Sequence, residues 1–266
     1  MSYPISNMYD SDISLSTSPL SNYCSHCGCD HVLPREPAMA AARKLMTQLA
    51  GEKCIDFDSK ATLLRKELKT DSLYGKARGK MFGVLFCRTA NGEEQILKAF
   101  SGQYNGLWEV DGWAPPLFDV QEFATLTQPA EQRIKTLGRE AEDTALSSDR
   151  RSRLLKKRKE LSQQLMKEIH RLYRLHNFRG RKISLLELFP DGSGIPTGTG
   201  DCCAPKLLNF AARKGFQPLG LAEFYWGRTN KSATRHEGYF YPACLDKCGP
   251  ILGFLLCGLE EQQCRN

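Results

Sequence analysis

The sequence predicts an α/β fold, in which a small mixed sheet is flanked by helices and carries a long basic helical insert. A hairpin signal predicts the sheet: β-prone runs at 81–88 and 95–100 flank an Asn-Gly turn, which supplies the positive φ angles that a tight connection needs. A further β-prone run at 219–226 adds a strand. Residues 129–177 hold little Gly or Pro and repeat apolar residues at helical spacing, which predicts one long helix or a helical hairpin.

Composition divides the chain into four segments. Residues 1–36 are expected to form a flexible segment that carries a dense group of cysteines and histidines. Residues 37–126 are the first part of the α/β core, with the hairpin, and residues 183–266 are its second part, with helices that begin at cysteines. The basic helical insert, 127–182, lies between the two parts in the sequence.

Each part of the core has helices of its own. Apolar residues at helical spacing predict a helix over 38–50, and a charged stretch predicts a more exposed helix over 56–69. The second part is expected to hold a short apolar element at 185–189, a helix at 204–214 that ends at Gly215, and a buried helix at 250–259 that ends near Gly258.

Cysteine usage and targeting signals bear on the cellular compartment. No run approaches the roughly 18 apolar residues of a membrane span, and no basic segment leads into an apolar one near the N-terminus. We therefore expect a cytoplasmic protein without a membrane partner, whose eleven cysteines are kept reduced. Clustered cysteines in that setting are typical of metal sites rather than of disulfides.

The net charge of +7 is concentrated in the insert. Residues 149–182 hold thirteen Lys and Arg against three Asp and Glu, so this segment alone carries +10. A basic block on a nearly neutral body is typical of proteins that bind a polyanion such as RNA, although a solvated helix face shows the same pattern. The candidate RNA-binding residues are Arg150, Arg151, Arg153, Lys156, Lys157, Arg158 and Lys159.

Residues 102–118 form an aromatic loop rich in Gly and Pro. Tyr104, Trp108 and Trp113 are candidates for stacking on unpaired bases. Packing against the body of the protein is the more common role for aromatic residues in such a loop, so both interpretations stay open.

Two cysteine blocks lie in the last quarter of the chain. Cys202-Cys203 forms the first, Cys244 and Cys248 form the second, and each block is followed by a proline. Because proline is tolerated at the first position of a helix, each block is expected just before a helix start. The positive field at a helix N-terminus lowers the pKa of a thiol, which favours metal ligation or nucleophilic attack. Two such blocks can converge on one site with three cysteine ligands.

Two other roles are open for these cysteines. Buried cysteines serve in many proteins as small apolar core residues. A cysteine nucleophile is the second alternative, and it needs a histidine base. His236 is the one histidine in this region of the sequence, in a loop rich in Lys and Arg.

A further Cys/His group lies near the N-terminus. Cys24, Cys27, Cys29, His26 and His31 include the C-x-x-C and C-x-H spacings of zinc knuckles. No second C-x-x-C follows at the usual finger distance, so a four-ligand site would have to come from this short stretch alone. Because these residues are too closely spaced to surround an ion comfortably, we expect separate thiols in a flexible segment.

The order of hairpin, cysteine-led helix, strand and second cysteine-led helix resembles the core of the zinc-dependent cytidine deaminase superfamily. That family carries an [HC]-x-E motif on one helix and P-C-x-x-C on the next. Three ligands hold a zinc ion that activates water, and the glutamate moves protons. The resemblance implies a deaminase-like fold with Zn²⁺ as cofactor, Cys202 (or Cys203) as the first ligand, and Cys244 and Cys248 as the other two.

The sequence departs from this pattern in two places. Three residues rather than two separate the second pair of cysteines, and Ala204 stands where the glutamate is expected. Asp201 and Glu223 are the nearby carboxylates that can replace it, and they are therefore the candidate catalytic residues. Alternation along the strand puts Glu223 on the same face as Tyr225 and on the opposite face from Trp226.

A wider resemblance covers most of the chain. The blocks K-M-F-G-V-L, P-P-L-F-D, G-x-G-D-C-x-A-P-K-L-L, A-E-F-x-W-G and F-Y-P-A-C-x-x-K-C-x-P-I-L occur in this order. Together they resemble the N-terminal extension of RluA-type RNA pseudouridine synthases, which precedes a separate catalytic domain. The resemblance implies two partners, ribosomal or transfer RNA and a separate pseudouridine synthase. Such synthases act through an H-R-L-D motif, whereas this chain has His170-Arg171-Leu172-Tyr173, so we do not expect it to make pseudouridine on its own.

We therefore expect a zinc-binding, deaminase-like accessory module in RNA modification that binds RNA through its basic helix. A hydrolytic zinc deaminase of a nucleobase or nucleotide is one alternative. A metal-free protein-interaction module, with its cysteines in the core, is the other.

Overall fold

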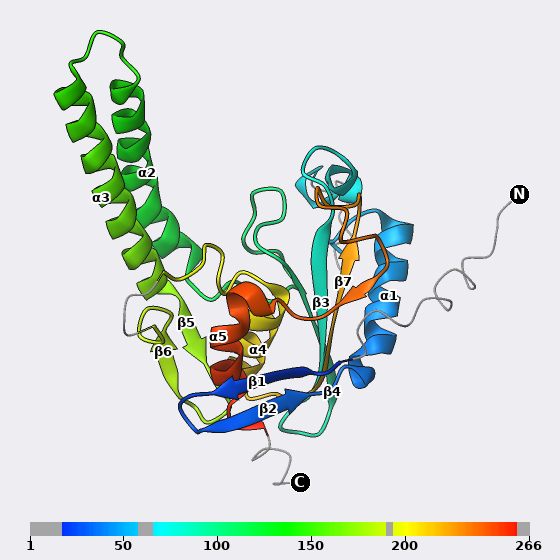
Figure 1. Ribbon diagram of the computed structural model, residues 1–266. Coiled ribbons are helices and arrows are strands. Elements are labelled where there is room, and N and C mark those ends of the chain that lie inside the picture. Colours follow the sequence, from blue (N-terminus) through cyan, green and yellow to red (C-terminus); the bar gives the residue numbers. More distant parts are fainter. Residues whose placement is uncertain (1–17, 58–65, 190–193, 260–266) are drawn as a thin grey trace, which may run out of the picture. The chain divides into compact units, whose positions relative to one another are not determined.

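A computed structural model describes residues 18–57, 66–189 and 194–259 (Figure 1). The chain forms two compact units. The first comprises residues 1–116, 176–181 and 196–266, and the second comprises residues 117–175 and 182–195. The part of the chain that the structure describes is thus mixed α/β, with five α-helices and small sheets. The predicted mixed sheet is wrong, because all pairings in the four-stranded sheet are antiparallel.

A four-stranded antiparallel sheet forms the centre of the first unit, with strand order β4-β3-β7-β8. The predicted hairpin is confirmed as β3 (Lys80–Arg88) and β4 (Glu94–Phe100), and the predicted third strand is confirmed as β7 (Gln217–Trp226). The short β8 (Phe240–Tyr241) pairs with the end of β7. Since β3 lies between β4 and β7, its side chains point alternately toward the two faces of a buried sheet.

One face of this sheet packs against α1 (Glu36–Glu52), which confirms the first predicted helix. Phe82 and Phe224 stack on this face with their ring centroids 5.8 Å apart. The aromatic loop packs here as well, since the indole N–H of Trp113 donates to the carbonyl oxygen of Ile55 at 2.8 Å and Tyr104 is fully buried. The loop is therefore part of the core, and these two rings are not available for stacking on bases.

The other face of the sheet packs against α4 (Cys203–Lys214), and α5 (Leu245–Leu256) packs in turn against α4. Helix α4 ends as predicted at Gly215, whose φ of 68° is left-handed. The predicted start of the last helix is wrong, because Pro250 lies inside α5 rather than at its first position. The helix begins at Leu245, so the second cysteine block extends into its first turn.

The N-terminal Cys/His group lies in a β-hairpin of β1 (Leu20–Cys24) and β2 (Cys29–Leu33). The expectation of a flexible segment through residue 36 is therefore wrong from Leu20 onward. The hairpin packs against α5, which makes extensive contacts with β1. Its inward side chains include Leu20 and Leu33, both buried, so apolar contacts hold it in place.

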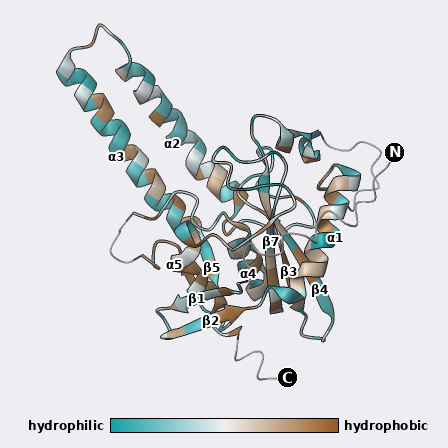
Figure 2. Ribbon diagram, turned by 45° about the vertical axis from the view of Figure 1, so that its right-hand side comes forward, coloured by the Kyte–Doolittle hydropathy of each residue, from teal (hydrophilic) through white to brown (hydrophobic). Residues whose placement is uncertain are grey.

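The second unit is a helical hairpin of α2 (Val120–Ala141) and α3 (Ser148–Leu172), joined by a short turn (Figure 1). Asp119 and Ser147 cap the two helices by accepting hydrogen bonds from backbone N–H groups. Hydrophilic residues predominate along both helices, whereas β3 and β7 are mostly hydrophobic (Figure 2). The unit begins at residue 117, ten residues before the expected start of the insert, because Phe118 packs against Tyr173 at the base of α3.

Short elements complete the described chain. Strands β5 (Arg174–His176) and β6 (Lys182–Ser184) pair with each other, and the expected apolar element at 185–189 is largely a turn. Most of the helix expected over 56–69 falls on residues 58–65, outside the described part, and two 3₁₀ turns follow it, Lys66–Leu68 and Thr70–Tyr74. None of the helices in the described ranges is long and apolar enough to cross a membrane.

Candidate metal centre

Three thiols from the two cysteine blocks form a cluster. The Sγ atoms of Cys202, Cys244 and Cys248 all lie within 4.8 Å of one another. Cys202 is the N-cap residue of α4, Cys244 is the N-cap residue of α5, and Cys248 lies in the first turn of α5. The convergence of the two blocks is therefore confirmed: the packing of α4 on α5 brings their N-termini together.

The loop before α4 is bound directly to the start of α5. The hydroxyl group of Thr199 donates to the carbonyl oxygen of Lys247 at 3.1 Å. The backbone N–H of Gly200 donates to the Sγ atom of Cys248 at 3.5 Å. These bonds fix the distance between the two blocks.

The pKa values of two of these thiols are shifted in opposite directions. The pKa of Cys244 is lowered to about 5, because its sulfur is hydrogen-bonded to the Cys202 thiol and to the backbone N–H groups of Lys247 and Cys248. The pKa of Cys202 is raised by the same thiol contacts with Cys244 and Cys248, and further by burial. One thiolate is thus present near neutral pH, which is a suitable first ligand for a cation.

The donor set fits zinc. Three thiolate ligands within 4.8 Å of one another can close around an ion with zinc–sulfur distances of about 2.3 Å. Cys202 and Cys244 are only partly buried, whereas Cys248 is fully buried. The cluster therefore has a solvent-facing side on which a fourth ligand can be bound, as in catalytic rather than structural zinc sites.

Cys203 does not belong to the cluster. Its side chain is fully buried between α4 and β3, and its thiol group donates to the carbonyl oxygen of Met81 at 3.4 Å. Burial raises the pKa of this thiol well above its ordinary value. The choice between the two adjacent cysteines thus falls on Cys202. The candidate base His236 lies in an exposed loop, where its ring is 3.4 Å from the hydroxyl group of Thr229.

Of the two candidate catalytic carboxylates, Glu223 is the one directed toward the cysteine helices. It is 3% exposed, and its carboxylate accepts a hydrogen bond of 2.8 Å from the backbone N–H of Ala204. Burial raises the pKa of Glu223 to about 7, although that hydrogen bond and the charge of Arg235 act in the opposite direction. The negative charge of Asp201 acts instead to raise the pKa of Lys206.

Lys206 is a buried lysine that the sequence analysis did not single out. It lies one turn beyond Cys202 on α4 and is fully buried. Its ammonium group donates to the carbonyl oxygens of Phe100 and Gly102, at 3.0 and 2.7 Å. Burial lowers its pKa to about 8. Lys206 therefore ties the end of β4 to α4 and places a positive charge beneath the cysteine cluster.

A basic pocket of about 340 Å³ lies at the end of β3, on the side of Glu223. Tyr225 and Arg235 line this pocket. Tyr225 lies two residues beyond Glu223 on β7, and the charge of Arg235 acts against the rise in the pKa of Glu223. A pocket lined by several cations suits an anionic ligand such as a phosphate group. The sequence signal for this pocket is the alternating K-x-R-x-K run at 76–80. The cations that line the pocket are Lys76, Arg78, Lys80, Lys231 and Arg235.

The seven candidate RNA-binding residues lie on the first half of α3, and six of them are exposed. Arg151 is partly buried, and its guanidinium group donates to the carbonyl oxygens of Ala141 and Asp143, so it stabilises the turn between α2 and α3. The guanidinium group of Arg158 lies against Gly138 of α2. Lys156, Lys157 and Lys159 are the exposed lysines of this group.

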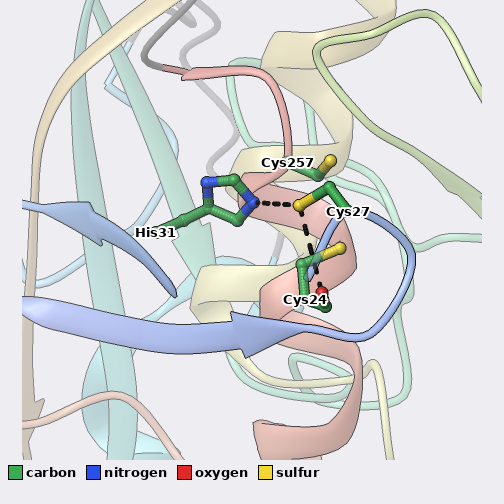
Figure 3. Close-up of side chains that lie close together, drawn as sticks. All are labelled: Cys24, Cys27, His31 and Cys257. Carbon is green, nitrogen blue, oxygen red and sulfur yellow. Dashed lines mark hydrogen bonds between the residues drawn. The ribbon is translucent and has the colours of Figure 1, made fainter. Parts of the chain in front are cut away.

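The N-terminal Cys/His group contributes to a second cluster. Cys24, Cys27 and His31 lie together with Cys257, which falls within the range of the buried helix expected over 250–259 (Figure 3). Burial acts to raise the pKa of Cys27, but hydrogen bonds from the backbone of Cys29 and from the side chains of the cluster outweigh it and lower that pKa to about 7. The expectation that any site here would have to use this short stretch alone is therefore wrong, because the fourth side chain comes from the far end of the sequence.

Comparisons of the chain with models of protein families, with curated proteins and with solved structures found no match. The assignment of function therefore depends on the geometry of the two clusters, the basic pocket and the basic helix.

Proposed function

We propose that this chain is a zinc-binding, deaminase-like module that works in RNA modification. The observation that carries the proposal is the cluster of Cys202, Cys244 and Cys248, in which two helix N-termini present three thiols to one point. The order of elements around it supports the resemblance to the deaminases: a β-hairpin, a cysteine-capped helix, a strand and a second cysteine-capped helix.

Zinc held at this cluster would supply a Lewis acid that lowers the pKa of a bound water molecule. The protein's own contribution is to hold the three sulfur atoms in place and to shield one side of the site. Cys248 forms the buried side, fixed by the N–H of Gly200. The partly exposed thiols of Cys202 and Cys244 form the accessible side.

Substituting Cys244 by serine is expected to remove one zinc ion per chain. Serine keeps the size of the side chain but replaces the soft thiolate, which zinc prefers, with a hydroxyl group that stays protonated. The measurement is the zinc content of the reduced, chelator-washed chain by elemental mass spectrometry. Cys87→Ser is the control, because Cys87 is a thiol of β3 that belongs to neither cluster. Equal zinc contents in Cys244→Ser and the control would contradict the site.

RNA binding through the basic helix is the second part of the proposal. Lys156, Lys157 and Lys159 are exposed on α3, and phosphate contacts by such residues release counterions from RNA. Replacing all three by glutamine is expected to weaken binding to structured RNA at low salt and to reduce the slope of log K against log salt by about 2–3. The control is a triple glutamine variant with the same net charge, at the exposed lysines Lys44, Lys66 and Lys69 of the first unit. If both variants lose the same affinity, the helix is not the RNA-binding surface.

The resemblance to the extension of the pseudouridine synthases supports a separate synthase as partner. In that case this chain would bind RNA or provide a surface for assembly. The synthase would form pseudouridine through its H-R-L-D motif. A metal-free protein-interaction module remains the alternative that a zinc content of zero would favour.

A hydrolytic deaminase is the second candidate function, and Glu223 favours it. The sequence lacks a glutamate at position 204, but the Glu223 carboxylate accepts a hydrogen bond from the backbone N–H of Ala204. A carboxyl group from the neighbouring strand thus contacts the backbone of the residue at which the resemblance expects a glutamate. Its pKa of about 7 suits a group that must both accept and donate a proton. The basic pocket nearby would hold the phosphate of a nucleotide or of an RNA backbone.

Replacing Glu223 by glutamine is expected to lower the rate of ammonia release from nucleotides or RNA by about 10²–10⁴-fold, the usual contribution of a general acid–base group. The amide can still accept the Ala204 N–H bond, so the zinc content should be unchanged. Asp201→Asn is the matched control and should stay within a few-fold of the wild type, because Asp201 acts on Lys206. If the wild-type chain with full zinc releases no ammonia from nucleosides, nucleotides or RNA, the chain is a binding module rather than a deaminase.

A further inference from the structure

The end of α5 opposite the three-cysteine cluster meets a second group of metal-binding side chains. Cys257 directly follows the helix, and Cys24, Cys27 and His31 come from the β1–β2 hairpin (Figure 3). The four ligand atoms all lie within 4.8 Å of one another. They belong to segments more than 220 residues apart in the sequence, so the fold itself assembles the group.

The turn of the hairpin places Cys27 beside His31. Gly28 has a φ of 73°, and its N–H donates to the carbonyl oxygen of Cys24 at 2.9 Å, which closes the turn between the strands. This turn brings the Sγ atom of Cys27 to 3.1 Å from the Nε2 atom of His31. A sulfur atom and a ring nitrogen bound to one zinc ion are about 3.3–3.8 Å apart, so a small adjustment suffices for ligation.

The backbone at Cys257, on the α5 side of the group, is also held in place. The carbonyl oxygen of Cys257 accepts a hydrogen bond of 3.0 Å from the backbone N–H of Phe178. Gly258 has a φ of 98°, and a Cβ atom there would lie 2.8 Å from the backbone nitrogen of Arg179. Both sides of the cluster are thus held by backbone contacts, which preset the positions of the four donors.

The burial of these side chains supports the interpretation of the group as a metal site. Cys24, His31 and Cys257 are each no more than 2% exposed, and Cys27 covers the outer side. Three cysteines and one histidine are the donor set of structural zinc sites, in which four protein ligands leave no open position. We propose that Cys24, Cys27, His31 and Cys257 bind a structural Zn²⁺ ion that joins the N-terminal hairpin to the end of α5.

Cys29 provides an internal control for this proposal. It lies two residues beyond Cys27, but its side chain is exposed and its thiol is 3.5 Å from the carbonyl oxygen of Cys27, outside the cluster. A thiol of the same hairpin can therefore be compared with the ligands in one experiment.

The first test is the zinc content of the full chain and of three cysteine-to-serine variants. We expect two zinc ions per chain in the wild type and in Cys29→Ser, and one in Cys257→Ser and in Cys244→Ser. A Cys257→Ser variant that keeps two ions overturns the proposal. If only Cys257→Ser loses zinc, this site is retained and the three-cysteine site is rejected. If only Cys244→Ser loses zinc, the three-cysteine site is retained and this proposal is rejected.

The second test uses the wild-type chain, so it does not depend on the folding of a variant. Alkylation of thiols, mapped by mass spectrometry, is measured before and after removal of zinc with a chelator. We expect Cys27 to react at least tenfold faster after chelation, while Cys29 reacts at the same rate in both states. Equal rates for Cys27 in the two states would overturn the proposal, whatever the zinc content at the other cluster.

Discussion

Substituting Gly253 by alanine is expected to separate the N-terminal hairpin from α5. A Cβ atom at position 253 would lie 1.9 Å from the carbonyl oxygen of Tyr23 and 2.9 Å from the nitrogen of Cys24. Both neighbours are backbone atoms and cannot rotate away, so the strand itself must move. We expect the free energy of unfolding to fall by about 3 kcal/mol or more, at the upper end of the cost of overpacking. The measurement is urea unfolding of the zinc-loaded chain.

Gly249→Ala is the matched control on the same helix. The nearest atom to a Cβ at position 249 is the side-chain nitrogen of Asn22, at 3.8 Å, which is an ordinary contact. Because alanine favours a helix over glycine, this variant should be neutral or more stable by up to about 1 kcal/mol. If the two variants have the same stability, the close approach of β1 to α5 at Gly253 is not a determinant of the fold.

The second large effect is expected at Gly83, where α4 approaches the sheet. A Cβ atom there would lie 2.6 Å from the Cβ atom of Cys203 and 3.1 Å from a methyl group of Leu207. Gly83→Ala should therefore lift α4 from β3 and lower the free energy of unfolding by about 2–3 kcal/mol. Since Cys202 caps α4, the same displacement should weaken zinc binding at the three-cysteine cluster.

A double-mutant cycle with Cys203→Gly tests this explanation. Removing the Cβ atom of Cys203 makes room for the new methyl group, so the two substitutions together should cost less than the sum of their separate effects. We expect a coupling of about 1–3 kcal/mol in urea unfolding, as for residues in direct contact. Additive effects would show that the cost of Gly83→Ala has another origin.

The central elements of the first unit were predictable because their signals are local. The hairpin was marked by two β-prone runs about an Asn-Gly turn, and α4 by its C-terminal glycine. The three-cysteine cluster followed from the helix starts that both blocks share. Pro250 predicts a helix start, but it lies inside α5, so the predicted start differs from the observed one at Leu245.

The second cluster could not be found from sequence because its members share no local pattern. Cys257 follows an apolar helix and resembles a core residue, and it is 226 positions away from His31. Similarly, no spacing rule relates Glu223 on β7 to Ala204 on α4. Their contact arises from the packing of a helix on a strand, through the hydrogen bond from the Ala204 N–H.

A cluster of candidate metal ligands lies at each end of helix α5: Cys244 precedes its first residue, and Cys257 follows its last. Its twelve residues span about 18 Å at 1.5 Å per residue. A rigid rod anchored at both ends cannot slide or turn at one end alone. Metal bound at one of the two groups should therefore raise the affinity of the other without being required for it, and the effect should be reciprocal.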